Sequence, residues 1–174
     1  MKYFVKFFVV TFFLVFCTHV IAEQKIVVLD LTYVLNNSKA GKDAQDFLKK
    51  SYSNNLKKYT NMEQALKKEE QDLLSKKTVL SKEEYTKKTD TLRKKVIDFQ
   101  SQRRSAIDKI ATQRSSSRET LIKALDPILE AYIKENNIAL VVDKKFALGG
   151  RPENDITKII TDKLNKTLPS LNLK

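Results

Sequence analysis

The chain has 174 residues, and its 33 basic and 21 acidic residues give it a formal net charge of +12. Its single cysteine, Cys17, and its single histidine, His19, both lie near the amino terminus, in a segment that has the features of an export signal. Once that segment is removed, no thiol or imidazole remains for nucleophilic catalysis, for a disulfide or for an ordinary zinc site. We therefore expect a protein that is not an enzyme and that holds no metal or cofactor.

Residues 1–22 are predicted to be a secretory signal that is cleaved after Ala22. Lys2 and Lys6 supply the positive start, and Phe7 to Cys17 is an apolar run broken only by Thr11. An uncleaved membrane anchor is the alternative, but the run is shorter than the roughly 20 residues of a membrane span. A lipoprotein modified at Cys17 is the other alternative, although Phe16 stands where a small residue is expected.

The mature chain is basic and poor in large apolar side chains. The signal takes with it two of the 33 basic residues, none of the 21 acidic ones and six of the nine phenylalanines, which leaves a charge of +10 in a chain without tryptophan. Such a charge favours acidic protein partners or an anionic membrane surface, and export argues against nucleic acid. The small supply of core residues indicates that oligomerisation completes the burial.

The first predicted element is a buried strand at Ile26–Leu31, and Asn36–Ser38 supply side chains that cap a following helix. From residue 42 to residue 126 the chain then has no glycine or proline. Apolar residues recur at nearly helical spacing from Leu48 to Leu73, through Leu56 and Tyr59. We predict a helix with one apolar stripe, or half of a coiled coil.

The stripe loses its phase at residues 75–81, where Ser81 and Glu84 have the spacing of a capping box. We interpret residues 75–81 as the tip of a helical hairpin and residue 82 as the approximate start of its second arm. One continuous helix with an incidental serine and glutamate is the alternative.

The second arm continues the apolar stripe through Ile107 towards Tyr132. Arginines and serines at stripe positions predict flexible arms, with a bend at Ser115–Ser117. At Asp126-Pro127 the chain either starts a new helix or kinks the existing one.

Asn136-Asn137 is predicted to end the second arm, and Ile138–Asp143 is a second strand. Phe146–Leu148 is a candidate third strand, and Asn154 or Asp155 caps a closing helix over 156–164. The fold class is therefore α+β, a small β body with one long helical hairpin. The expected segments are 1–22 (signal), 23–38 (amino-terminal strand of the body), 39–137 (arm) and 138–174 (carboxy-terminal strands and closing helix).

The sequence offers few candidates for catalysis or nucleotide binding. Asp30 and Asp143 each end a strand, where they are expected to cap loops or to pair with lysines. Gly149-Gly150 lacks the spacing of a phosphate-binding loop.

The strongest functional signal is a run of basic residues in the second arm, which is opposed by only two acidic residues over 93–118. These residues either solubilise the arm or attract acidic client chains and lipid headgroups. In the first arm, Tyr52, Tyr59 and Met62 belong either to the seam between the arms or to a surface that touches clients. The basic candidates are Arg93, Lys94, Lys95, Arg103, Arg104, Lys109, Arg114 and Arg118.

The order of these elements, together with the motifs at both ends, resembles the Skp/OmpH family of periplasmic chaperones. At the amino-terminal end the resemblance lies in Ile26–Leu31 and in the Ser-x-x-Gly-Lys sequence of Ser38–Lys42. At the carboxy-terminal end it lies in Leu140–Asp143 and in Asp155–Thr157.

The resemblance implies a homotrimer in which strands of three subunits form the body and three arms surround a cavity. Candidates for the contacts of that body are Ile26, Val28, Leu140 and Val142. An unfolded outer-membrane protein would be held in the cavity, without ATP, in the periplasm. The rival interpretation is a structural envelope protein whose basic arms bind anionic lipid or cell-wall polymer.

Overall fold

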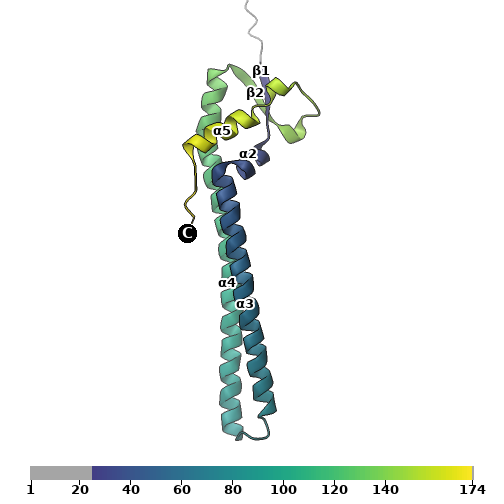
Figure 1. Ribbon diagram of the computed structural model, residues 1–174, viewed down its shortest axis with the longest axis vertical. Helices are drawn as coiled ribbons and strands as arrows, with labels where there is room; N and C mark the ends of the chain where they lie inside the picture. Colours follow the sequence, from purple (N-terminus) through teal and green to yellow (C-terminus); the bar gives the residue numbers. More distant parts are fainter. Residues whose placement is uncertain (1–24, 174) are drawn as a thin grey trace, which may run out of the picture.

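The computed structural model describes residues 25–173, and it has a small body at one end of a long helical hairpin (Figure 1). The predicted signal segment, residues 1–22, lies outside the described residues. Within residues 25–173, no helix combines the length and the apolar character of a membrane span. The elements in chain order are β1 (Lys25–Leu29), α2 (Leu31–Asn37), α3 (Lys39–Ser75), α4 (Lys82–Glu135), β2 (Ile138–Asp143), η1 (Lys144–Phe146), η2 (Pro152–Asn154) and α5 (Thr157–Thr167).

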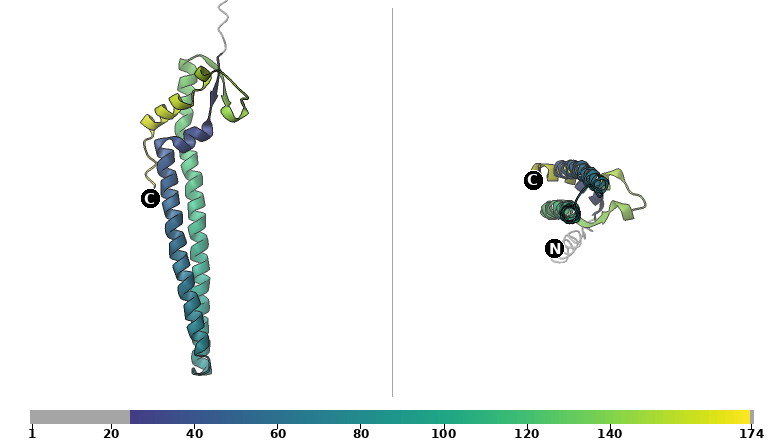
Figure 2. Two further views of the ribbon diagram at one scale, coloured as in Figure 1. Left: turned by 45° about the vertical axis from the view of Figure 1, so that its right-hand side comes forward. Right: turned by 90° about the horizontal axis from the view of Figure 1, so that it is seen from below.

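Helices α3 and α4 are the two arms of the hairpin and lie side by side in both views (Figures 1 and 2). At 1.5 Å per residue, the 37 residues of α3 extend about 56 Å and the 54 residues of α4 about 81 Å. The predicted tip is confirmed, because α3 ends at Ser75 and α4 begins at Lys82.

The predicted capping box at the start of α4 is also confirmed. The Ser81 hydroxyl accepts from the Glu84 amide at 3.3 Å, and the Glu84 carboxylate accepts from the Ser81 amide at 3.1 Å. The hydrogen bonds from the Ser81 hydroxyl and amide hold the pKa of Glu84 below its ordinary value. The turn therefore ends α3 and starts α4 as an independent helix.

Helix α4 is continuous through both places where the sequence predicts an irregularity, Ser115–Ser117 and Asp126-Pro127. The chain is helical at Ser115–Ser117, and the buried Ser117 hydroxyl donates to the Gln113 carbonyl at 2.6 Å. Flexing at this point stays a prediction. Pro127 lies inside α4, so the alternative of a new helix at this position is wrong. The helix continues because proline removes one hydrogen-bond donor while the flanking turns pack on the body.

The connection from β1 to the arm contains a helix that the sequence analysis did not predict. The strand ends at Leu29 rather than Leu31, and Asp30 caps α2 by accepting from the Tyr33 amide at 2.7 Å. Ser38, which is fully buried, then caps α3 by accepting from the Gly41 amide at 3.2 Å. The predicted capping role of this segment is thus carried by Ser38.

Strands β1 and β2 form a two-stranded parallel sheet. Val28 also accepts from the Ile156 amide at 3.0 Å, which brings the segment before α5 beside β1. The predicted strand at Phe146–Leu148 is wrong. Phe146 ends the 3₁₀ turn η1, and within residues 25–173 the segment 146–148 joins no ladder because the loop leads away from the sheet (Figure 2).

The closing helix, expected over 156–164, runs from Thr157 to Thr167. Ile156 occupies the N-cap position of this helix. The predicted capping residue Asp155, one position earlier, accepts a hydrogen bond from the Thr157 amide at 2.9 Å. The core lies where β1, α2 and α5 pack against the base of α4. Its members include Val27, Leu29, Val34, Leu35, Leu121, Leu125, Tyr132, Ile138, Ile156, Ile160 and Leu164.

Candidate functional site

The eight basic candidates on α4 are all exposed to solvent. From the first, Arg93, to the last, Arg118, they extend along about 38 Å of helix. They therefore form a charged band along the arm and not a single pocket.

Most of this positive charge is free of acidic partners. Lys95 Nζ lies 2.6 Å from Glu69 Oε1 and so joins the two arms, and Arg93 Nη1 lies 3.5 Å from Asp90 Oδ1 on the same helix. The other six basic candidates have no carboxylate within 4.0 Å among residues 25–173. Exposed pairs contribute only about 0–1 kcal/mol each, and unpaired surface charges act on anions over a range of roughly 10 Å.

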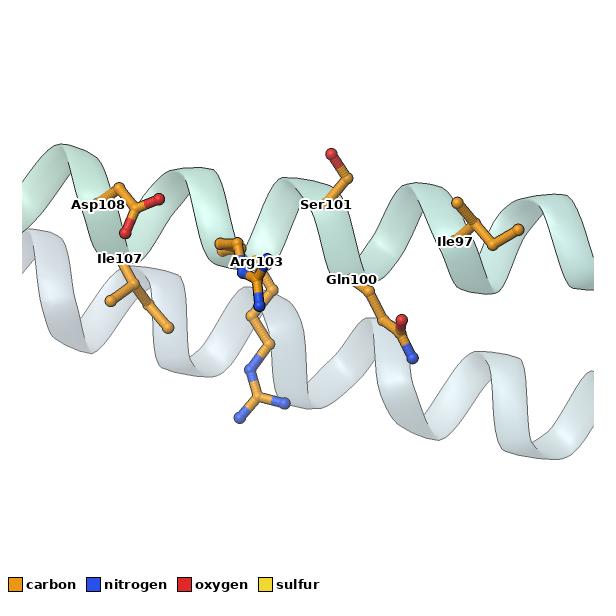
Figure 3. A pocket seen from close by; sticks show the side chains of 7 residues that line it. Ile97, Gln100, Ser101, Arg103, Ile107 and Asp108 are labelled. Carbon is orange, nitrogen blue, oxygen red and sulfur yellow. The ribbon is translucent and has the colours of Figure 1, made fainter.

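Apolar side chains interrupt the basic band in the middle of α4. A hollow of about 690 Å³ lies there. Figure 3 shows its lining side chains, of which Gln100 and Ile107 project over the α3 side and Ser101 projects towards the opposite edge. Ile97 and Ile107, two of its lining residues, are 58% and 57% exposed. The hollow thus combines guanidinium groups with exposed aliphatic side chains. The hollow is lined by Ile97, Gln100, Ser101, Arg103, Arg104, Ile107 and Asp108.

The aromatic candidates on α3 have different environments. Tyr59 is only 8% exposed, its hydroxyl donates to the Gln102 carbonyl at 3.0 Å, and its ring meets Phe99 edge-on at 6.1 Å. Tyr59 thus packs in the seam between the arms, which is the first of the two roles predicted for it. Tyr52 is 59% exposed, and Met62 is half-buried.

Three apolar residues were missed as surface contacts. Leu56 and Ile107 belong to the predicted seam stripes, yet they are 55% and 57% exposed, and Ile97 lies outside the stripes. Periodicity identifies the apolar side of each helix, but only the position of the second helix decides which of those residues it covers. No signal in the sequence separates Leu56 from its buried neighbour Tyr59.

The four body candidates lie on one face of the sheet. The register pairs Ile26 with Leu140 and Val28 with Val142, while Val27, between them, points to the core. Ile26 and Leu140 are each 53% exposed. The sheet therefore presents an apolar outer face in the single chain.

Two aspartates at the ends of the strands have local structural partners, as expected. Asp30 caps α2, and Asp143 accepts from the Lys145 amide at 3.1 Å and pairs with its ammonium at 3.0 Å. Nearby, Lys144 Nζ lies 2.6 Å from Asp155 Oδ2. Burial alone would raise the pKa of Asp155, but hydrogen bonds from Lys144 and Thr157 hold that pKa below its ordinary value.

Comparison with known proteins agrees with this architecture. Residues 25–164 match the model of the family described as outer membrane protein (OmpH-like). The chain belongs to this OmpH-like family. Its fold is also that of a solved family member, an OmpH-like protein of Caulobacter crescentus CB15 proposed as an outer membrane chaperone. The two structures align with a TM-score of 0.80 and 18% identity, covering 90% of this chain and 93% of the other.

A second OmpH-like relative is the Skp-like protein of Pseudomonas aeruginosa PAO1. It is 25% identical over 166 residues, which cover 95% of this chain and 99% of the relative. The similarity thus extends over the body and both arms.

Proposed function

We propose that the protein is an ATP-independent holdase chaperone of the periplasm that captures unfolded outer-membrane proteins and prevents their aggregation. The observation that carries the proposal is the hairpin itself. Its arms extend far beyond the core and expose unpaired basic residues together with aliphatic and tyrosine side chains. Many weak contacts of this kind suit an unfolded chain, which offers no fixed shape to a preformed pocket.

We infer that the active form is a homotrimer. Parallel sheets are normally covered on both faces, and a sheet of two strands has little stability alone in water. In this chain one face carries Ile26 and Leu140, each half exposed. Association of three bodies through this face would bury these residues and direct three arms around one cavity.

The periplasmic location is supported by the predicted signal and by family membership. A cleaved signal directs the chain across the inner membrane, and the solved relative is proposed as an outer membrane chaperone. Clients exposed between the inner and outer membranes would carry apolar strands that aggregate unless they are kept apart.

The test is an aggregation assay with residues 23–174 and a urea-denatured outer-membrane β-barrel protein, diluted into buffer without nucleotide. Suppression of light scattering at one trimer per client is expected. No suppression at that ratio would refute the holdase, whereas salt-sensitive sedimentation with anionic vesicles and no client protection would favour the envelope-structural rival.

The trimer is tested separately by the solution mass of wild type and of Leu140→Asp. The charge on the sheet face is expected to convert a trimer into monomers, and Leu74→Asp at the exposed arm tip is expected to leave the trimer intact. A monomeric wild type would overturn the assembly.

A further inference from the structure

One side of the hairpin carries a groove between α3 and α4 that begins at the α2–α3 elbow. Two adjoining hollows form it, one of about 710 Å³ near the body and one of about 100 Å³ farther along the arms. Tyr52 on α3 and Ile110 on α4 line both hollows, so they are two parts of one groove. We call it the arm groove.

The wall of the arm groove is apolar and exposed. Tyr52 and Leu56, one helical turn apart on α3, are 59% and 55% exposed, and Ile107 on α4 is 57% exposed. At its deeper end the groove reaches Leu48 and Leu121, which belong to the buried residues. Apolar side chains of a bound segment could therefore continue the packing that already exists between the arms.

Basic side chains exceed acidic ones around the groove. Arg114 and Arg118 line the part near the body, together with Lys49 and Asp46, and Arg103 and Glu63 line the distal part. Within residues 25–173, none of these basic groups lies within 4.0 Å of a carboxylate. Guanidinium groups without a carboxylate partner favour a ligand that carries carboxylates.

The dimensions of the groove favour an extended ligand. Its α3 wall runs from Gly41 to Glu63, which is about 33 Å of helix and matches about ten residues of extended chain. The distal hollow of about 100 Å³ has room for a single side chain. A whole helix, about 10 Å wide, does not fit there.

We propose that the arm groove binds an extended polypeptide segment of about ten residues in which apolar side chains alternate with carboxylates. Tyr52, Leu56 and Ile107 contact the apolar side chains, and Arg114 and Arg118 hold the carboxylates. This inference rests on the proposed holdase function, which supplies unfolded segments as ligands. It adds that capture is localised on one side of each hairpin and is selective for charge.

The absence of tryptophan from the whole chain provides a clean readout. The probes are two synthetic peptides of 12 residues that alternate valine with aspartate or with lysine, each with one central tryptophan. Blue-shifted tryptophan emission reports binding to residues 23–174. Tighter binding of the aspartate peptide, by at least about tenfold, is expected, and high salt should reduce the difference.

Two groove variants and one matched control locate the site. Tyr52→Ser/Leu56→Ser/Ile107→Ser is expected to bind the aspartate peptide at least about tenfold more weakly. Arg114→Ser/Arg118→Ser should lose most of the preference over the lysine peptide. In the control, Leu74→Ser/Val79→Ser, two exposed apolar residues at the arm tip, outside the groove, are replaced, and affinity should stay within about twofold of wild type.

A labelled single cysteine gives a readout that does not depend on the folding of the triple variant. Leu56→Cys provides the only thiol in residues 23–174, and a polarity-sensitive dye on it should shift to the blue with the aspartate peptide. An unchanged dye spectrum, equal binding of both peptides, or wild-type affinity of the triple variant would overturn the proposal.

The remaining outcomes separate this proposal from others. A changed solution mass of the groove variants would identify the groove as a subunit interface and overturn the proposal. If wild type suppresses client aggregation but the groove variants bind the aspartate peptide normally, only the arm groove fails. If wild type suppresses no aggregation, the proposed holdase function is refuted, and with it the arm-groove proposal that depends on that function.

Discussion

Replacing Gly41 with alanine tests why the elbow between α2 and α3 requires glycine. Gly41 lies in the first turn of α3, and within residues 25–173 no glycine has a positive φ. A Cβ at this position would lie 2.0 Å from the Leu35 carbonyl oxygen and 2.9 Å from the Ser38 hydroxyl. Close approach of two helices, and not an unusual backbone angle, therefore excludes a side chain here.

Two effects of opposite sign determine the magnitude. Alanine in place of glycine favours an ordinary helix by about 1 kcal/mol. The Cβ, however, would lie roughly 1.4 Å closer to a main-chain oxygen of α2 than van der Waals contact allows. That helix cannot move freely because Val34 and Leu35 are buried in the core. Overpacking costs about 1–3 kcal/mol and more where the main chain must move, so we take a cost of about 3–4 kcal/mol here. After the helix gain of about 1 kcal/mol is subtracted, the expected net loss is about 2–3 kcal/mol.

The assay is thermal and urea unfolding of residues 23–174, followed by circular dichroism at one fixed protein concentration because self-association would shift the midpoint. A loss of 2–3 kcal/mol corresponds to a melting temperature lower by about 4–12 °C for a chain of this size. Gly149→Ala is the matched control, since no atom lies within 4 Å of its Cβ, and its change should stay within about 0.5 kcal/mol. A Gly41→Ala variant as stable as wild type would refute the steric explanation.

Three further predictions concern single contacts. Tyr59→Phe removes the hydrogen bond between the arms and should lower the free energy of unfolding by about 0.5–1.5 kcal/mol, whereas Tyr52→Phe should leave it unchanged; equal effects would contradict the seam assignment. The lowered pKa of Glu84 means that its cap is complete above the unfolded value near 4.5 and is lost as pH falls through the folded value. The protection of amides at the start of α4 against hydrogen exchange, relative to the unstructured rate at the same pH, should therefore fall on acidification, and Glu84→Gln, which keeps the reach to Ser81 without the carboxylate, should remove that pH dependence. Asn137 has a φ of 51°, so Asn137→Gly should raise the melting temperature slightly or leave it unchanged, and a clear decrease would argue against the left-handed turn before β2.

The parts predicted correctly from the sequence are those set by local interactions. The tip of the hairpin follows from a loss of apolar phase and from the hydroxyl–carboxylate pairing of Ser81 and Glu84, which needs only four residues. Strand β2 has the predicted bounds because it is a short β-branched run between turn-forming asparagines and an aspartate.

The errors occur where distant segments decide the local conformation. Helix α2 is only seven residues long and has no periodic signal of its own, but Val34 and Leu35 are buried against α4 and α5. Phe146–Leu148 has strand-like residues, yet a strand needs a partner edge, and none of the strands within residues 25–173 pairs with this segment. The exposed fraction of each apolar side chain along the arms could not be predicted from the sequence either, because it depends on how each helix is rotated about its axis relative to the other.

The sequence by itself determined that the protein has a long helical hairpin between two strands, and that it is basic, since these properties depend on helix propensity, capping and charge alone. It also placed the basic band on α4. Only the tertiary structure decided which residues of the apolar stripes are covered. The packing of α3 on α4 buries Tyr59 and leaves Tyr52, Leu56 and Ile107 in the arm groove, because residues on one apolar side of a helix differ only in their angle to the neighbouring helix.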